Sequence, residues 1–249
     1  MWLYQNSTEI NSYKYTARVY RGCTGFLKQD SILSSFSVFS DPLGAVLMED
    51  RAVTMATASS APCIRHVFLT GSPGVGKTTL IHKAIEQLQQ SSLHLRGFYT
   101  EEVRAGGRRS GFDVITLSGR RGPLARVGQG RGPAVGQYTV DLASFESLAL
   151  QELSTKDHGT STSSILIIDE IGKMELFSQG FIQLVRRHLS QSTCPILGTI
   201  PVPKGKPLGL VEEVRSRKDV KVFMVTKENR NSLLPEIVQT VMEARTHIA

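Results

Sequence analysis

The segment at residues 71–78, GSPGVGKT, constrains this chain more than any other because it has the spacing G-x-x-x-x-G-K-[ST]. An apolar run at residues 67–70 precedes it. The residues that follow place apolar side chains on one helical stripe, namely Leu80, Ile81, Ala84, Ile85 and Leu88. A strand, a glycine-rich loop and a helix in this order are typical of a phosphate-binding loop, or P-loop. The sequence therefore predicts that this turn binds a nucleoside triphosphate.

The glycines of this loop have a physical role. They allow backbone conformations and close approaches that a Cβ would block, so that successive N–H groups can face an anion. The start of the helix adds the positive end of its dipole. The predicted nucleotide-binding residues of the loop are Gly71, Ser72, Pro73, Gly74, Val75, Gly76, Lys77, Thr78 and Thr79.

The side chains of the loop divide the remaining work. Lys77 is expected to contact the β- and γ-phosphates and to act in catalysis, and the Thr78 hydroxyl is expected to bind Mg²⁺. We expect Thr79 to cap or pack the first helical turn, and Pro73 and Val75 to stiffen the loop. A plain strand-to-helix turn would not need lysine and threonine together.

A second segment, ILIIDEIGKME at residues 165–175, ends an apolar run on two adjacent carboxylates. A P-loop needs an acid from another strand, so Asp169 is expected to bind Mg²⁺ opposite Thr78 as the acid of a Walker B strand. Glu170 is expected to orient or deprotonate a water molecule aimed at the γ-phosphate, as the second catalytic residue beside Lys77. Both acids therefore join the predicted nucleotide site. A carboxylate here favours hydrolysis over transfer, because a transferase gains from excluding water.

The rest of the chain alternates strands with helices. Residues 177–189 carry a helical stripe of apolar side chains, and the strand-like runs PILGTI and VKVFMVT follow. The last helix contains Leu233, Leu234, Ile237, Val238, Val241 and Met242. This alternation predicts an α/β fold, with a mostly parallel sheet flanked by helices and with ligands at the carboxyl ends of the strands.

Several polar residues fall at the predicted carboxyl ends, each with two interpretations. Thr199 either senses the γ-phosphate or is an ordinary strand threonine, and Lys204 and Lys206 face either the nucleotide or solvent. Lys173 neutralises the two acids, contacts phosphate or lies on the surface. In VTKEN, Asn229 either reads a base loosely, since an amide both donates and accepts, or caps a helix.

An arginine-rich insert separates the two motifs. Two strand-like runs flank RAGGRRSG and predict a β-hairpin, and residues 104–131 hold seven arginines against one acid, Asp113. This density suits a lid in which Arg108 or Arg109 stabilises the transition state, or an RNA contact. The alternative is a solvated hairpin. No aromatic residues alternate with the arginines as in single-strand binders, so nucleic acid is the less favoured partner.

Charge and composition indicate a globular protein with an anionic ligand. The net charge is +7 and the hydrophobic content 40%, and no apolar run approaches the roughly 20 residues of a membrane span. Three scattered cysteines, Cys23, Cys63 and Cys194, favour a reducing compartment, which we take to be the cytoplasm. Without a heptad repeat or an apolar face that suggests assembly, we expect a monomer.

The amino-terminal sixty residues differ from the rest. Residues 1–61 are rich in tyrosine and serine and lack a period, so we expect a disordered extension, with a P-loop domain at residues 62–249. Met55 is a second candidate start. A mitochondrial transit segment is the alternative use of this extension.

The chain resembles the cancer-related nucleoside-triphosphatases of vertebrates and their bacterial and archaeal relatives. The resemblance rests on RHVFLTGSPGVGKTTLIHKA, GFYTEEVR, GGRRSGFDVITLSG, VGQYTVDLASFE, IDEIGKMELFSQ, GTIPVPKGKP and DVKVFMVTKENRN. It implies a RecA-like P-loop fold and Mg²⁺-dependent hydrolysis of several nucleoside triphosphates. It also implies that the nucleotide binds at residues 71–78 and around Asp169 and Glu170. The first 54 residues depart from the family, which makes Met55 the expected initiator.

The leading functional hypothesis is a Mg²⁺-dependent nucleoside-triphosphate hydrolase of broad base selectivity. A P-loop kinase acting on a nucleoside, a nucleotide or an RNA end would use the same loop, with the arginine hairpin as its lid. A nucleotide switch or an RNA-binding module is the third alternative.

Overall fold

The computed structural model describes residues 63–91, 93–128, 130–154, 164–191 and 194–248. The expected disordered extension at residues 1–61 lies outside these residues, so that expectation stays a prediction. Within the described part, nine strands form one mixed sheet in the order β5-β6-β4-β3-β2-β7-β8-β1-β9. None of the described helices is both long and apolar enough to cross a membrane.

One part of the sheet is parallel and carries the predicted nucleotide site. Its members are β1 (His66–Thr70), β2 (His94–Ala105), β7 (Ser164–Ile168), β8 (Ile196–Thr199) and β9 (Val220–Met224). The strand that ends at the two acids, β7, is separated from β1 by β8, which pairs in parallel with both. The carboxyl ends of β1, β8 and β7 therefore lie side by side at one edge.

The other part of the sheet is antiparallel and begins with the predicted hairpin. β2 pairs with β3 (Arg108–Thr116), which confirms the hairpin around the glycine pair. β4 (Arg121–Val127), β6 (Tyr138–Val140) and β5 (Ala134–Val135) continue this part. Because β2 also pairs in parallel with β7, the hairpin extends the main sheet and does not form a separate insert.

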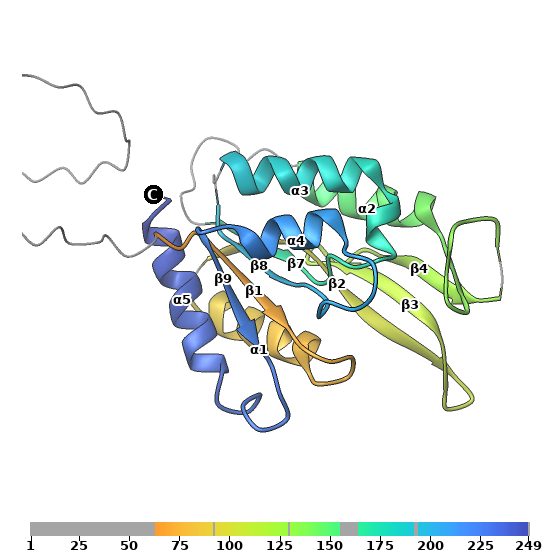
Figure 1. Ribbon diagram of the computed structural model, residues 1–249, viewed down its shortest axis with the longest axis horizontal. Coiled ribbons are helices and arrows are strands. Elements are labelled where there is room, and N and C mark those ends of the chain that lie inside the picture. The colour runs from red at the N-terminus through yellow and green to blue at the C-terminus, as the bar shows by residue number, and fades with distance from the viewer. Residues whose placement is uncertain (1–62, 92, 129, 155–163, 192–193, 249) are drawn as a thin grey trace, which may run out of the picture. The chain divides into compact units, whose positions relative to one another are not determined.

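Helices cover both faces of the sheet (Figure 1). On one face lie α1 (Lys77–Gln89) and α5 (Leu234–Thr246), and on the other α2 (Leu142–Ser154), α3 (Gln179–Gln191) and α4 (Gly209–Ser216). Successive strand residues point to opposite faces, so Val67 and Leu69 of β1 pack toward α1 and Phe68 packs in the other core. All five residues of β1 are buried, as a strand covered on both faces requires.

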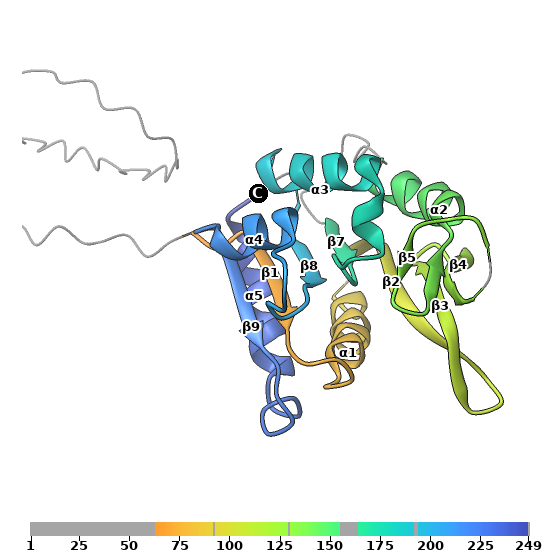
Figure 2. The same ribbon diagram turned by 45° about the vertical axis from the view of Figure 1, so that its right-hand side comes forward.

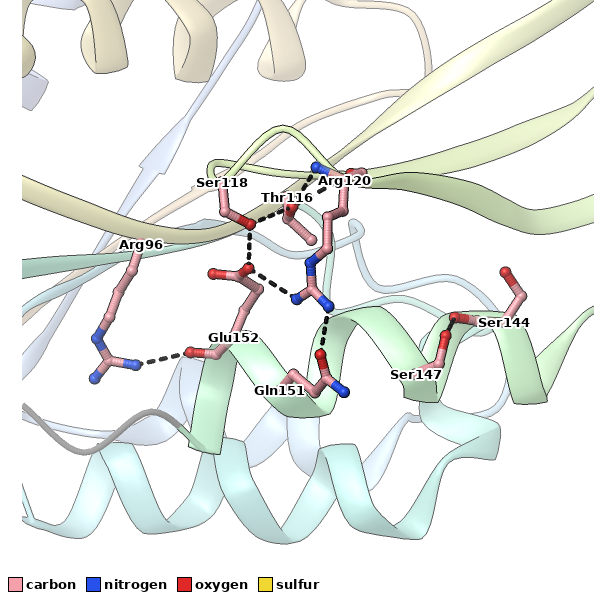
Figure 3. A network of polar contacts seen from close by, with 8 residues as sticks. All are labelled: Arg96, Thr116, Ser118, Arg120, Ser144, Ser147, Gln151 and Glu152. Atoms are coloured by element: carbon pink, nitrogen blue, oxygen red, sulfur yellow. Dashed lines mark hydrogen bonds and ion pairs between the residues drawn. The ribbon is translucent and has the colours of Figure 1, made fainter.

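A polar network fixes the turn between β3 and β4 to the last part of α2 (Figure 3). Ser118 Oγ donates to Glu152 Oε1 at 2.6 Å, and Arg120 Nη2 donates to the same oxygen at 3.1 Å. From β2, Arg96 Nη1 donates to the Glu152 carbonyl oxygen at 3.0 Å. These bonds satisfy charged groups that packing has removed from water, and they join the antiparallel strands to the helical layer.

Candidate active site

The predicted P-loop lies between β1 and α1, as its sequence indicates. Gly74 and Gly76 have φ values of 74° and 111°, in the left-handed region that favours glycine. A Cβ on Gly71 would lie 2.5 Å from the carbonyl oxygen of Val225, so this backbone approach also requires glycine. Gly76 is the N-cap of α1, and no side chain caps this helix. The first N–H groups of α1 are therefore available to an anion.

The other loop side chains divide between the core and the surface. Val75 is buried and packs among the residues between the sheet and α1, so it anchors the loop to the core as well as stiffening it. Ser72, Pro73 and Thr79 are exposed. Thr79 is exposed and α1 has no side-chain cap, so neither expected role of Thr79 is seen among the described residues.

Lys77 bridges the P-loop and the strand that carries the acids. Its Nζ donates to the Gly71 carbonyl oxygen at 3.3 Å and lies 4.0 Å from Glu170 Oε2. Only 9% of Lys77 is exposed, whereas 34% of the Glu170 side chain is. A cation that spans these two elements stands where it can meet both an anionic ligand and the second carboxylate.

Asp169 is buried beside a threonine of the neighbouring strand. It is 1% exposed, and Thr199 Oγ1 donates to its Oδ1 at 2.5 Å. Burial raises the pKa of Asp169, while hydrogen bonds from Thr199 and Thr78 and the charge of Lys77 oppose the rise. Among the described residues, nothing hydrogen-bonds to its Oδ2. Thr199 thus contacts the acid, which neither of its two sequence interpretations specified.

In the segment after Asp169, the carboxylates of Glu170 and Glu175 both lie close to Gly172. The Asp169–Glu170 peptide bond is cis. Gly172 N donates to Oε2 of Glu175 at 3.0 Å, and Glu175 is only 4% exposed, in the turn η1 (Glu175–Phe177). A Cβ on Gly172 would lie 2.8 Å from Glu170 Oε1 and 3.0 Å from Glu175 Oε2. Gly172 thus lets both carboxylates approach the same backbone.

Burial also shifts the pKa values of these two acids. It raises the pKa of Glu175 to about 8, with a further contribution from the charge of Glu170. Burial raises the pKa of Glu170 as well, and Lys77 opposes this shift. Sequence reasoning missed Glu175 and Gly172. The signal for them was a third acid six residues after Asp169, in a segment that otherwise reads as a loop.

An aromatic pair flanks the site from the hairpin side. His82 lies one turn after Thr78 on α1, and its ring meets Tyr99 of β2 edge-on, with 4.3 Å between centroids. The charge of His82 also acts on Asp169. The sequence patterns predicted neither residue as part of the site. The spacing of four residues between Thr78 and His82 does place both on the same face of α1.

The β2–β3 hairpin extends past the carboxyl ends of the parallel strands. β2 pairs with β7 only as far as Phe98 and Ile168, so its residues 99–105 project beyond the acids (Figure 2). The predicted arginine lid is less basic than its arginine count suggests, because acids inside and outside the counted segment pair with most of its arginines. Five of its arginines form ion pairs with acids, namely Arg104 and Arg109 with Glu102, Arg120 with Glu152, Arg121 with Asp113 and Glu101, and Arg126 with Asp113.

This pairing bears on the proposed lid residues. Arg109 Nη2 lies 2.7 Å from Glu102 Oε2, and its guanidinium covers the Phe112 ring at 5.4 Å. The hydrogen bond that Arg109 donates to Glu102 raises the pKa of Arg109. Arg108 is exposed near the hairpin tip and forms no ion pair with any described residue. An arginine clamp on phosphate therefore depends on Arg108 more than on Arg109.

The loop after β9 packs against the P-loop. Arg230 Nη1 donates to the Val75 carbonyl oxygen at 3.3 Å. Asn229 uses both ends of its amide locally, because Oδ1 accepts from Thr226 N at 2.8 Å and Nδ2 donates to the Met224 carbonyl oxygen at 2.9 Å. The capping interpretation of Asn229 is therefore wrong, because the N-cap of α5 is Leu233 and this helix has no side-chain cap. The Asn229 amide instead closes the turn that follows β9.

The geometry of the site agrees with what comparisons with known proteins find. A β-strand, P-loop and helix, with an acid on a strand two places away, define a P-loop nucleoside triphosphatase. The NTPase family model matches residues 66–238, and the chain belongs to this family.

Relatives extend across vertebrates and bacteria. The human cancer-related nucleoside-triphosphatase is 66% identical over 187 residues, which cover 73% of this chain and 98% of that protein. Nucleoside-triphosphatase THEP1 of Thermotoga sp. (strain RQ2) is 41% identical over 175 residues, which cover 70% of this chain and 94% of that protein.

Two solved structures have the same fold. The solution structure of the human cancer-related nucleoside triphosphatase matches with a TM-score of 0.64 and 67% identity, covering 71% of this chain and 97% of that one. The crystal structure of THEP1 from Aquifex aeolicus matches with a TM-score of 0.63 and 36% identity, covering 71% of this chain and 98% of that one. The resemblance expected from the sequence is confirmed.

Proposed function

We propose that this protein hydrolyses nucleoside triphosphates to diphosphates and phosphate in a Mg²⁺-dependent reaction of broad base selectivity. The observation that carries the proposal is the position of Lys77, which spans the P-loop carbonyl oxygen of Gly71 and the carboxylate of Glu170. The Lys77 ammonium group thereby joins the phosphate-binding loop to Glu170, the acid proposed to orient and deprotonate water. The family of the chain and the names of its relatives support the same reaction.

The chain offers ligands that fit Mg²⁺. Thr78 provides a hydroxyl, and the unpaired Oδ2 of Asp169 provides a buried carboxylate oxygen, which are the hard donors that this ion prefers. When bound, the ion would neutralise charge on the phosphates. Thr199 fixes the carboxylate through its 2.5 Å hydrogen bond, so Asp169 would present Oδ2 in one orientation.

The chain's own groups then have defined tasks. The backbone N–H groups of the P-loop hold the phosphates, and Lys77 stabilises negative charge between the β- and γ-phosphates. Glu170 orients the attacking water and accepts its proton, and its partial burial favours a carboxylate that is a stronger base than usual. The Asn229 amide is bonded to its own loop, and an amide would not select guanine as a carboxylate does, which supports broad base selectivity.

A panel of nucleoside triphosphates, assayed for free phosphate with Mg²⁺ and without any acceptor, tests this proposal. We expect Glu170→Gln to lower kcat about a hundredfold or more while Mg²⁺-nucleotide binding is retained, because the amide cannot accept the proton of water. Lys77→Ala is expected to weaken nucleotide binding itself. Near-native turnover by Glu170→Gln would remove Glu170 from the mechanism, and phosphate transfer to a labelled acceptor without free phosphate would indicate a kinase.

A further inference from the structure

A cavity of about 620 Å³ lies on the face of the sheet opposite α1. Its walls come from the segment after β7, from α3 and from the loop that leads into α4. The apolar residues of its lining are Leu176, Ile182, Pro207, Leu208 and Leu210. None of its lining residues belongs to the P-loop, so this cavity is distinct from the nucleotide site described above.

Three cations stand around this apolar surface. Lys173, Arg186 and Lys206 line the cavity, and its ten lining residues include no acid. Arg186 Nε is bound to Glu213 Oε2 at 2.8 Å. Lys173 and Lys206 are exposed, and neither forms an ion pair with any acid that the structure describes. The cavity therefore offers two free ammonium groups to an anion.

The two lysines come from loops at the same edge of the sheet. Lys173 is three residues beyond Glu170, and Lys206 lies in the loop that follows β8. Arg215 Nη2 donates to the Pro201 carbonyl oxygen at 2.8 Å and holds the start of that loop against α4. Ligands of parallel α/β sheets bind outside the carboxyl ends of the strands, and this cavity opens there.

We propose that this cavity is a second binding site for a phosphorylated organic molecule of mononucleotide size. Lys173 and Lys206 bind the phosphate, and the leucine and isoleucine side chains contact the organic body. The volume falls within the roughly 300–1,000 Å³ of small-molecule sites, and a few charged groups around an apolar floor are their usual chemistry. Single-stranded nucleic acid fits less well, because no aromatic side chain lines the cavity to stack on bases.

The position of this site gives it a direct route to the active site. A ligand there contacts Lys173 and Leu176, which flank the hydrogen bond between Gly172 and Glu175. The segment from Glu170 to Glu175 is thus shared by the two sites. Any effect of the ligand on hydrolysis rests on the proposed function, whereas binding itself does not.

The test measures binding in the full chain with AMP as the probe. The Lys77→Ala variant suppresses the P-loop site, and equilibrium dialysis with labelled AMP then reports the second site. We expect one saturable AMP per chain, and we expect the added double substitution Lys173→Glu and Lys206→Glu to weaken it about tenfold or more. The matched control is Lys204→Glu, which reverses a charge on the same loop outside the cavity and should change the affinity less than about twofold.

Three outcomes would overturn the proposal. These are the absence of saturable AMP binding in Lys77→Ala, an equal loss in Lys204→Glu, and tight binding of a ten-nucleotide oligoadenylate by a chain that does not bind AMP. Thermal unfolding of each variant separates lost binding from lost folding. A failure of the proposed hydrolysis would appear separately, as the absence of phosphate release by the native chain with Mg²⁺ and nucleoside triphosphates, and would leave this binding measurement intact.

Discussion

Gly172 is packed between two carboxylates, and this crowding makes it a direct test of how the proposed catalytic acid, Glu170, is placed. A methyl group there would lie 2.8 Å from Glu170 Oε1 and 3.0 Å from Glu175 Oε2. Its φ is not in the left-handed region, so alanine would strain the side-chain contacts and not the backbone. Gly172→Ala therefore displaces Glu170 while leaving the P-loop in place.

We expect Gly172→Ala to lower kcat by about 10- to 100-fold, because small displacements of a catalytic group are costly. The KM for Mg²⁺-ATP should change less than about threefold, since the phosphate-binding loop is untouched. Steady-state phosphate release measures both constants. Gly209→Ala is the matched control, because nothing lies within 4 Å of the added Cβ. A variant with altered KM and native kcat would contradict this role for Gly172.

Glu175 gives the stability of the protein a pH dependence. Its pKa is raised to about 8 by burial and by Glu170, so the folded chain holds it protonated at neutral pH. A folded-state pKa above the unfolded value stabilises the fold fully below the unfolded pKa, and this contribution is lost as pH rises through about 8. Glutamine remains uncharged and still accepts from Gly172 N.

We therefore expect Glu175→Gln to unfold like the native chain near about pH 5 and to be more stable than it near about pH 9. Urea unfolding across this range measures the free energy of unfolding of both proteins. Glu175→Ala, which also removes the acceptor of the Gly172 hydrogen bond, should be less stable than Glu175→Gln at every pH. Parallel pH profiles for the native chain and Glu175→Gln would show that Glu175 is not protonated in the fold.

At the scale of elements, the local patterns were predictable and the pairings were not. Helical stripes and the P-loop spacing located β1, α1, β7 and α5, and the glycine pair located the β2–β3 hairpin. The sequence contains no local signal that β2 joins β7, because their paired residues Phe98 and Ile168 lie far apart in the chain. That pairing joins the predicted hairpin to the parallel strands and gives one mixed sheet.

The candidate site shows the same division. The motif spacing predicted Lys77, Asp169 and Glu170 as site residues, because the residue type alone indicates the chemistry of each. The contact of Thr199 with Asp169 depends on β8 lying between β7 and β1, which only the strand order reveals. The charge of the hairpin was misjudged, because half of the acid pairings of its arginines use Glu101 and Glu102, just outside the counted segment.

At the scale of the whole molecule, the family module occupies the carboxyl-terminal three quarters of the chain. The family model matches residues 66–238, and the part of this chain that aligns with the human relative covers 98% of that protein. The described elements begin at His66 of β1, and both core clusters consist of residues from this point onward.

We therefore expect a chain that begins at Met55 to fold and hydrolyse nucleoside triphosphates like the full chain. Its unfolding temperature should agree within about 2 °C, because it keeps every described strand and helix, and its kcat should agree within about twofold. Thermal unfolding and phosphate release measure the two quantities side by side. A chain that begins at Gly71 is the opposite control, since it lacks strand β1, which pairs with both β8 and β9, and should not fold. A lower unfolding temperature or kcat for the Met55 chain would mean that residues 1–54 support the domain, and the expected start at Met55 would then be wrong.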